Sequence, residues 1–238
     1  MAGDYRYVPR DLDNGWLLVR GDGGKTFSLP YGVKLRLLDV AGGYENFEVL
    51  EGIHKGARAK VRSKSKSESF LLKNVMHRPG ASVRFNLSEQ AIWFGGRGPY
   101  NAFSGGGHRG FTPVAPGTYA LALPAFPTSA TRTAYERWTR FHRSWFRIGL
   151  DVSKDRFLHP GEISDGCVTV RQFLFDPATR DPVPPGFSDL PAGAGSEPGL
   201  LGLPLPPRRH PCIGWDLIYD YLILCRSGDQ SVGTLVVV

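Results

Sequence analysis

The sequence predicts a mainly β protein. Thirty glycines and nineteen prolines in 238 residues supply many turns. Apolar and polar residues alternate over short runs, which is the period of a half-buried strand. Few stretches are rich enough in helix formers for a helical bundle. A chain of this length can bury one good core and still have residues left for a small second module.

The first region is expected to be a small all-β module over residues 1–80. Its strand-like runs are short and separated by glycine-rich turns. The runs are Trp16–Val19, Lys34–Val40, Phe47–Leu50 and Ala59–Val61. The tract Ser63–Ser69, built of Ser, Lys and Glu, is typical of a linker or a hairpin.

A net charge of +7 and a pI near 9.4 indicate anionic partners. Cations occur at every second residue near the end of the first region, so an extended strand would place them on one face. They are Arg58, Lys60, Arg62, Lys64 and Lys66. The stripe suits either a solvated sheet edge that resists aggregation or an anion-binding surface. No aromatic residues interleave with it and no recognition helix lies nearby, so nucleic acid is not an expected partner.

The second region, residues 81–238, is expected to form the larger domain. Its predicted strands are Val83–Leu87, Gln90–Phe94, Tyr119–Leu123 and Phe146–Leu150, followed by a last strand, Val232–Val238, that closes the sheet. Aromatic residues at three-and-four spacing predict a helix between Ser129 and Trp145, and a helical face runs from Trp215 to Cys225. Residues 176–211 are rich in Pro, Gly and Ala and form an expected irregular insertion.

The segment from His159 to Val170 carries the chemistry. Cys167 directly follows Gly166 at the end of a tight loop that enters a β-branched strand. A nucleophilic thiol needs a nearby base, and His159 lies upstream in the same segment. Ser164 is expected to orient the loop, and Asp165 either to orient His159 or to solvate the turn. From the residues alone, a buried inert cysteine beside a surface histidine is the favoured interpretation.

The run Ser164-Asp165-Gly166-Cys167-Val168 resembles the Ser/Thr-His-Gly-Cys-Ile/Val signature of L,D-transpeptidases of the YkuD type. Other segments agree with this family in order and spacing, so the resemblance covers about residues 83–175. They are Asn86–Trp93, Ser104-Gly105-Gly106, Thr112-Pro113 and Pro116-Gly117-Thr118-Tyr119. Motifs that agree in order are more specific than one alone.

The chain departs from the family pattern at several places. Asp165 stands where the family has a histidine, and Ile148-Gly149 stands at the usual upstream His-Gly. His159 resembles the shorter-spaced histidine of divergent, toxin-like members that secretion systems deliver into competing bacteria. Thr169 occupies the substrate-recognition position where an arginine is common. Recognition of substrate carboxylates then needs other cations, for which Arg147 and Arg171 are the candidates.

The resemblance implies a YkuD-like β-sandwich or barrel with one or two helices, acting on peptidoglycan stem peptides. Cys167 would form an acyl-enzyme, His159 would move the proton, and the N–H groups of Gly166 and Cys167 would hold the oxyanion. No cofactor or metal is expected, because the chain lacks a cluster with metal-ligand spacing. Alternatives are a peptidoglycan cysteine hydrolase, either a carboxypeptidase or an endopeptidase, and a catalytically decayed protein that binds the anionic wall.

His142 on the expected helix is a rival base, whereas Cys212 and Cys225 are expected to be structural. The sequence contains no apolar run long enough to span a membrane, and the polar stretch Met1–Asp13 does not resemble a Sec signal. A wall substrate therefore requires an exit from the cytoplasm to the periplasm or wall, either through a dedicated secretion machine or with a phage lysis event. An immunity or secretion partner is consistent with that route.

Overall fold

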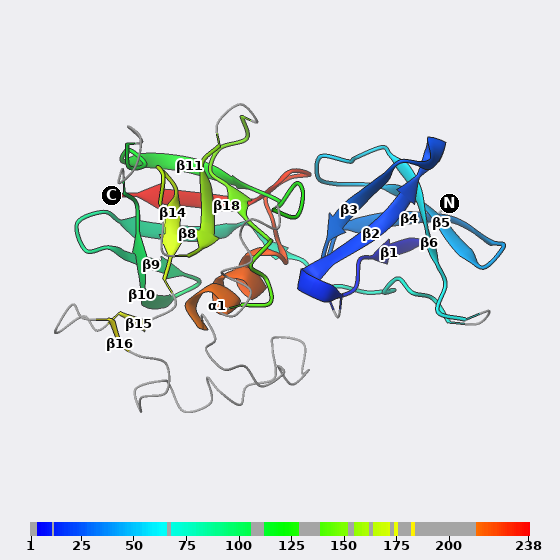
Figure 1. Ribbon diagram of the computed structural model, residues 1–238, viewed down its shortest axis with the longest axis horizontal. Coiled ribbons are helices and arrows are strands. Elements are labelled where there is room, and N and C mark those ends of the chain that lie inside the picture. The colour runs from blue at the N-terminus through cyan, green and yellow to red at the C-terminus, as the bar shows by residue number, and fades with distance from the viewer. Residues whose placement is uncertain are drawn as a thin grey trace.

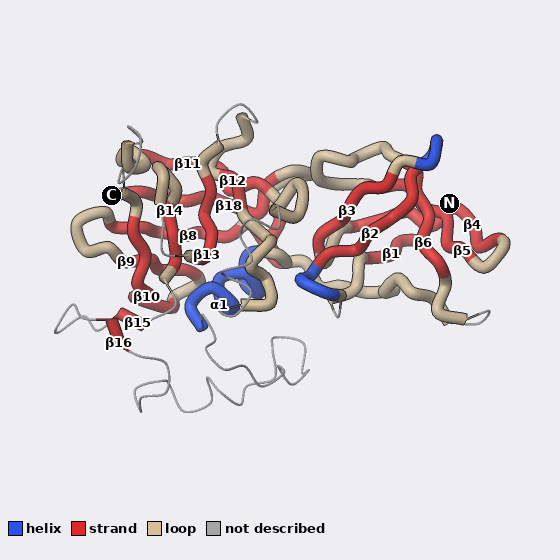
Figure 2. Tube along the Cα trace, viewed as in Figure 1, coloured by secondary structure: helices blue, strands red, loops and turns tan. Residues whose placement is uncertain are grey.

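The computed structural model describes most of the chain as a mainly β protein with two large sheets, as the sequence predicts (Figure 1). Strands dominate the trace, and α1 (Ile213–Leu222) is the α-helix of the described part (Figure 2). The described residues are 4–10, 12–65, 68–105, 112–128, 139–151, 155–161, 164–171, 174–175, 182–183 and 213–238.

The N-terminal sheet has six strands in the order β1-β4-β5-β6-β2-β3. Their bounds are Tyr5–Tyr7, Lys34–Ala41, Tyr44–Val49, Arg58–Arg62, Trp16–Gly21 and Thr26–Pro30. The strands expected in this region are all present. Short 3-10 turns cover Asp13–Gly15 and Asp22–Gly24. One face packs a core that includes Leu17, Leu35 and Phe47.

The interpretation of the basic stripe as a sheet edge is wrong. β6 lies inside the sheet, with Phe47 of β5 opposite Ala59 on one side and Arg20 of β2 opposite Lys60 on the other. The strand ends at Arg62, so it carries fewer cations than the sequence pattern indicates. Lys64 lies beyond it and contacts Glu68, and residue 66 lies outside the described residues.

The C-terminal sheet has eight strands in the order β11-β18-β8-β9-β10-β14-β13-β12. Their bounds are Gly117–Ala122, Ser231–Val237, Ala81–Asn86, Ala91–Phe94, Arg97–Phe103, Val168–Val170, Phe157–Pro160 and Phe146–Arg147. A bridge between Leu121 and Ile148 and a 2.7 Å hydrogen bond from Gly149 N–H to Ala120 O link the two outer strands. The sheet is therefore a nearly closed barrel.

The last strand is confirmed, but it does not close the sheet. β18 pairs in parallel with β8 and antiparallel with β11, so it lies inside the sheet. Closure comes instead from β11 and β12. The pairs β7–β17 (Arg78–Pro79, Cys225–Arg226) and β15–β16 (Leu174–Phe175, Pro182–Val183) stand apart from it. The rest of the expected 176–211 insertion lies outside the described residues.

The helix predicted from Trp215 onward is confirmed as α1, whose Trp215, Ile218 and Tyr219 are fully buried in the barrel core. It ends at Leu222, and Cys225, expected on the same helical face, lies in β17 instead. None of the helices in the described part of the chain has the length and apolar content to cross a membrane.

The helix expected up to Trp145 is absent from its described end, residues 139–145, which form turns; residues 129–138 lie outside the described residues. The Thr139 hydroxyl accepts the Phe141 N–H (3.0 Å) and the Ser144 N–H donates to Phe141 O (3.0 Å). Hydroxyls that bond nearby backbone groups favour turns over helix. The aromatics pack in different directions, Phe141 on Tyr219 and Trp145 on His159.

Charged pairs join the N-terminal module to the C-terminal domain. Arg226 makes a two-pronged contact with Glu51, at 2.9 and 2.8 Å, and Arg10 pairs with Asp220 at 2.6 Å. Both pairs are mostly buried. Burial raises the pKa of Asp220, and the Arg10 guanidinium opposes that rise. These contacts tie the N-terminal module to the barrel.

Candidate active site

The candidate site lies on the outer face of β12, β13 and β14. β13 runs parallel to β14, which places His159 opposite Thr169 and Leu158 opposite Val168. Successive side chains of a strand point to opposite faces. Leu158 and Val168 belong to the barrel core, so His159 and Thr169 lie on the other face. Local sequence does not specify this parallel pairing.

The same alternation brings further site residues to this face. Cys167 lies two positions before Thr169, and Phe157 lies two positions before His159. Arg147 of β12 is opposite Phe157. The structure therefore brings Cys167, His159, Thr169 and Arg147 together on neighbouring strands.

Cys167 is held by a loop that links two of the sequence motifs. The Ser164 hydroxyl donates to Cys167 O (2.6 Å) and accepts the Gly105 N–H (3.2 Å). Gly166 N–H donates back to Gly105 O (3.0 Å). Gly166 has φ +74°, a conformation that favours glycine. The Ser164 hydroxyl thus connects the backbone at Cys167 with the backbone at Gly105.

Cys167 is buried, and its sulfur has polar neighbours. The Phe157 N–H points at Sγ from 3.4 Å, and the thiol lies 4.0 Å from Asp155 O. A backbone N–H directed at sulfur favours its negatively charged form. The expected oxyanion role of the Gly166 N–H does not match this arrangement, because that N–H already bonds Gly105 O.

The His159 ring is fixed on three sides. Nδ1 lies 2.8 Å from Pro160 O and Nε2 lies 3.2 Å from the Thr169 hydroxyl. The Trp145 indole stacks on the ring, with centroids 4.1 Å apart and planes 17° apart. A carbonyl accepts only, so Nδ1 carries the proton and Nε2 is the basic nitrogen. Asp165 takes part in neither of these ring contacts, and its expected role in orienting His159 is not seen in them.

Arg147 borders a small cavity that is also lined by Trp145 and Phe157, the residues that contact His159 and Cys167. The guanidinium carbon is 5.5 Å from the centre of the Phe157 ring, and the side chain is 92% buried. Its Nε has no hydrogen-bond partner among the described residues. The cavity of about 10 Å³ is lined by Leu123, Ala125, Phe126, Thr128, Trp145, Arg147 and Phe157. A buried guanidinium with an unused N–H among apolar side chains suits a carboxylate ligand.

Thr169 and Arg171 were the other residues expected to contact substrate. Thr169 was expected to contact substrate, but it is fully buried and bonds His159. Arg171 lies over the Phe103 ring at 4.2 Å, on the β10 side of β14. Arg147 is on β12, so β13 and β14 separate the two arginines. The two arginines are therefore not on neighbouring strands.

The rival base His142 is buried in the turn that holds Trp145. Its Nδ1 lies 3.1 Å from Thr139 O, and its own carbonyl accepts the Trp145 indole N–H (2.8 Å). His142 therefore supports the indole that covers His159. Cys225 is buried, its thiol lies 3.1 Å from Tyr221 O, and burial raises its pKa. Cys212 lies outside the described residues.

Sequence reasoning missed Trp145, Phe157 and Gly105 as parts of this site. The spacing of Trp145 indicated a helix, and Phe157 and Gly105 act through backbone atoms that no side-chain motif reports. No group of three or more His, Cys, Asp or Glu side chains in the described part of the chain is arranged to hold a metal ion. Comparison of the chain with protein-family models, curated proteins and solved structures gives no match.

Proposed function

We propose that the protein is a cysteine acyltransferase of the L,D-transpeptidase type, with a YkuD-like barrel that acts on peptidoglycan stem tetrapeptides. The parallel pairing of β13 and β14 carries this proposal, because it brings His159 and Cys167 to one face beside a buried arginine. This pairing is evidence independent of the family resemblance, because the resemblance rests on sequence motifs and not on the register between strands.

In the proposed reaction, the Cys167 sulfur attacks the carbonyl carbon of an L-centre in the stem peptide. The thiol proton passes to Nε2 of His159, which the Thr169 hydroxyl vacates by rotating. A C–S bond forms, the C–N bond to the terminal D-amino acid breaks, and His159 gives its proton to the leaving amine. An acceptor amine then attacks the thioester, loses its proton to His159, and releases Cys167.

Arg147 is proposed to bind the carboxylate of the departing amino acid. It lies opposite Phe157, whose N–H points at the Cys167 sulfur, so its guanidinium is on the nucleophile's side of the sheet. Arg171, on the other side of β14, would then bind the acyl portion of the stem peptide or the acceptor.

Mass spectrometry of the intact protein with a purified disaccharide tetrapeptide tests the proposal. We expect an adduct of the tripeptide acyl portion on Cys167, loss of the terminal D-alanine and, with D-methionine added, its exchange into the product. Cys225→Ser should retain the adduct and Cys167→Ala should lose it.

Products that carry only a free tripeptide acid, even with excess acceptor, would identify a hydrolase. Cleavage of cross-linked peptides without loss of a terminal amino acid would identify an endopeptidase. An unmodified Cys167 and unchanged muropeptides under reducing conditions would contradict the enzyme and leave the wall-binding alternative.

A further inference from the structure

The outer face of the N-terminal sheet is a basic surface. Cross-strand partners share a face, and Arg20 lies opposite Lys60, Lys60 opposite Asn46, and Arg58 opposite Glu48. Glu48 in turn lies opposite Arg36. We call this surface the basic face, and its cations are Arg20, Arg36, Arg58, Lys60 and Arg62.

The cations of the basic face outnumber its carboxylates, which are Glu48 and Asp39, the residue opposite Asn46. Arg36 pairs with Glu48, but Arg20, Arg58, Lys60 and Arg62 form no ion pair with a described residue. Like charges directly opposite each other in a sheet are destabilising. Arg20 and Lys60 are such a pair, so an anion bound between them would remove an unfavourable interaction.

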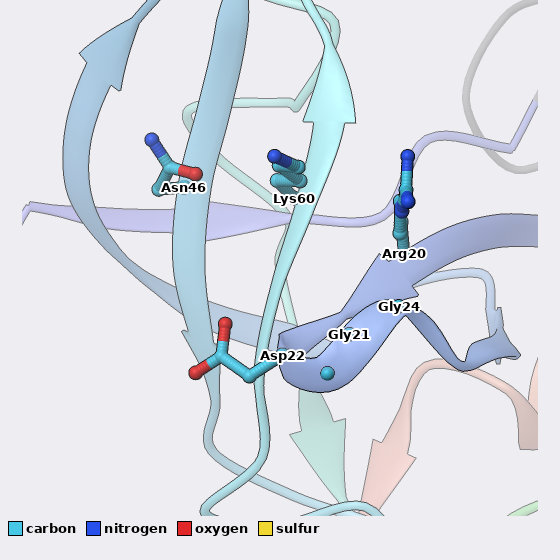
Figure 3. A pocket seen from close by; sticks show the side chains of 7 residues that line it. Arg20, Gly21, Asp22, Gly24, Asn46 and Lys60 are labelled. Atoms are coloured by element: carbon cyan, nitrogen blue, oxygen red, sulfur yellow. The ribbon is translucent and has the colours of Figure 1, made fainter.

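An open cavity of about 320 Å³ lies at this pair. Its lining residues are Arg20, Gly21, Asp22, Gly23, Gly24, Asn46 and Lys60. Figure 3 shows the Arg20 and Lys60 side chains extending to the same side of the sheet, while the Asp22 carboxylate points away from Arg20. Ligand cavities in proteins are mostly apolar, whereas this one is lined by two cations, the amide of Asn46, the Asp22 carboxylate and glycines.

We propose that the basic face binds an extended acidic polypeptide segment, one of whose carboxylates enters the cavity between Arg20 and Lys60. The cations of β6 recur at every second residue, a spacing of roughly 6.6 Å. Carboxylates on alternate residues of an extended peptide have the same repeat. All but one of the cations are arginines, whose planar fork matches a carboxylate.

A nucleic acid fits the surface less well. Binding of single strands uses exposed aromatic rings as stacking platforms. Tyr44 and Tyr5 are the exposed tyrosines here, and lysine ammonium groups lie over both rings: Lys60 at 5.0 Å and Lys34 at 4.0 Å. A carboxylate ligand needs no ring.

Fluorescence anisotropy with labelled poly-L-glutamate tests the proposal, using the full chain with Cys167→Ala so that no acyl transfer interferes. The double variant Arg20→Gln/Lys60→Gln should weaken binding by about tenfold or more, because it removes both charge-assisted contacts. The control variant Lys73→Gln/Arg84→Gln makes the same change in net charge elsewhere and should stay within about twofold.

Circular dichroism confirms that each variant is folded. Absence of poly-L-glutamate binding by the parent chain overturns the proposal. Equal weakening in both double variants also overturns it, because net charge alone would then explain the binding. Tighter binding of a thymidine oligonucleotide of matched charge would assign the face to nucleic acid instead, and tighter binding of polyphosphate would assign it to phosphate polymers.

Discussion

The two sheets each present a polar outer face, and the two faces differ in the burial and the pairing of their polar groups. Around Cys167 the polar groups are buried and paired: His159 bonds Pro160 O and Thr169, and Ser164 bonds Cys167 O. On the basic face the cations are largely exposed, and Arg20 faces Lys60 with no described acidic partner.

This difference suits one face to catalysis and the other to binding of an anion. Buried groups with satisfied hydrogen bonds hold one geometry, which bond-making chemistry requires. Exposed like charges hold no fixed geometry but attract a flexible anion over roughly a Debye length of 8 Å. Substitutions should therefore act through rates on the first face and through affinity and stability on the second.

The largest effect is expected for His159→Ala. Loss of the base should lower the rate of acyl transfer by roughly 10²- to 10⁴-fold and move iodoacetamide alkylation of Cys167 to higher pH. His142→Ala should leave the pH profile of alkylation in place, because His142 bonds Thr139 O and supports Trp145. A shift with His142→Ala and none with His159→Ala would reverse the assignment.

A smaller effect is expected for Arg147→Ala. Removing one partner of a buried charge pair costs about 2 to 5 kcal/mol, which corresponds to a loss of roughly 30-fold or more in kcat/KM. The informative readout is selectivity between a stem peptide with a free C-terminal carboxylate and its C-terminal amide. The parent enzyme should prefer the acid, and Arg147→Ala should not.

Arg147→Lys keeps the charge without the fork and should recover part of that preference. Arg171→Ala is the matched control, because Arg171 lies over Phe103 on the other side of β14. Equal loss of the preference in both arginine variants would contradict the placement of the leaving group at Arg147.

Thr169→Val tests whether the buried hydroxyl positions His159. Without the bond to Nε2 the ring loses one of its fixed contacts. We expect kcat to fall by about tenfold, the low end of what residues that orient a reacting side chain contribute. The pH profile of Cys167 alkylation should also change, whereas Thr169→Ser should restore both. An unchanged profile would make Thr169 a packing residue.

The sequence predicts the strands and α1 well, because apolar periodicity is a local property. The runs at Trp16, Lys34 and Ala59 all became strands, and the face from Trp215 became α1. Strand order is not local. β6 therefore resembled an edge strand in the sequence although β5 and β2 flank it in the sheet.

Within the candidate site, the sequence predicts which residues are present but not how they are arranged. Cys167, His159 and Ser164 carry recognisable chemistry, whereas the role of Thr169 follows from a parallel register between strands. Trp145 was expected on a helix because aromatic spacing reports burial and not direction. Turn hydrogen bonds from Thr139 and Ser144 decide the backbone there.

The smallest effect is expected for Arg20→Gln, and it should be a gain in stability. Arg20 and Lys60 are like charges directly opposite in a sheet, an arrangement that costs roughly 0.2 to 1 kcal/mol. Arg20→Gln relieves it while leaving the contact of Lys60 with Tyr44 in place. Urea unfolding at low salt should show a higher midpoint with an unchanged slope. The gain should shrink at about 1 M salt, where screening acts over roughly 3 Å.

Arg226→Gln is the contrasting variant. Arg226 is paired with Glu51 in a mostly buried contact, so its loss should destabilise the protein at either salt concentration. If Arg20→Gln instead destabilises the protein at low salt, Arg20 has a stabilising partner in the folded chain and the basic face is not under electrostatic strain.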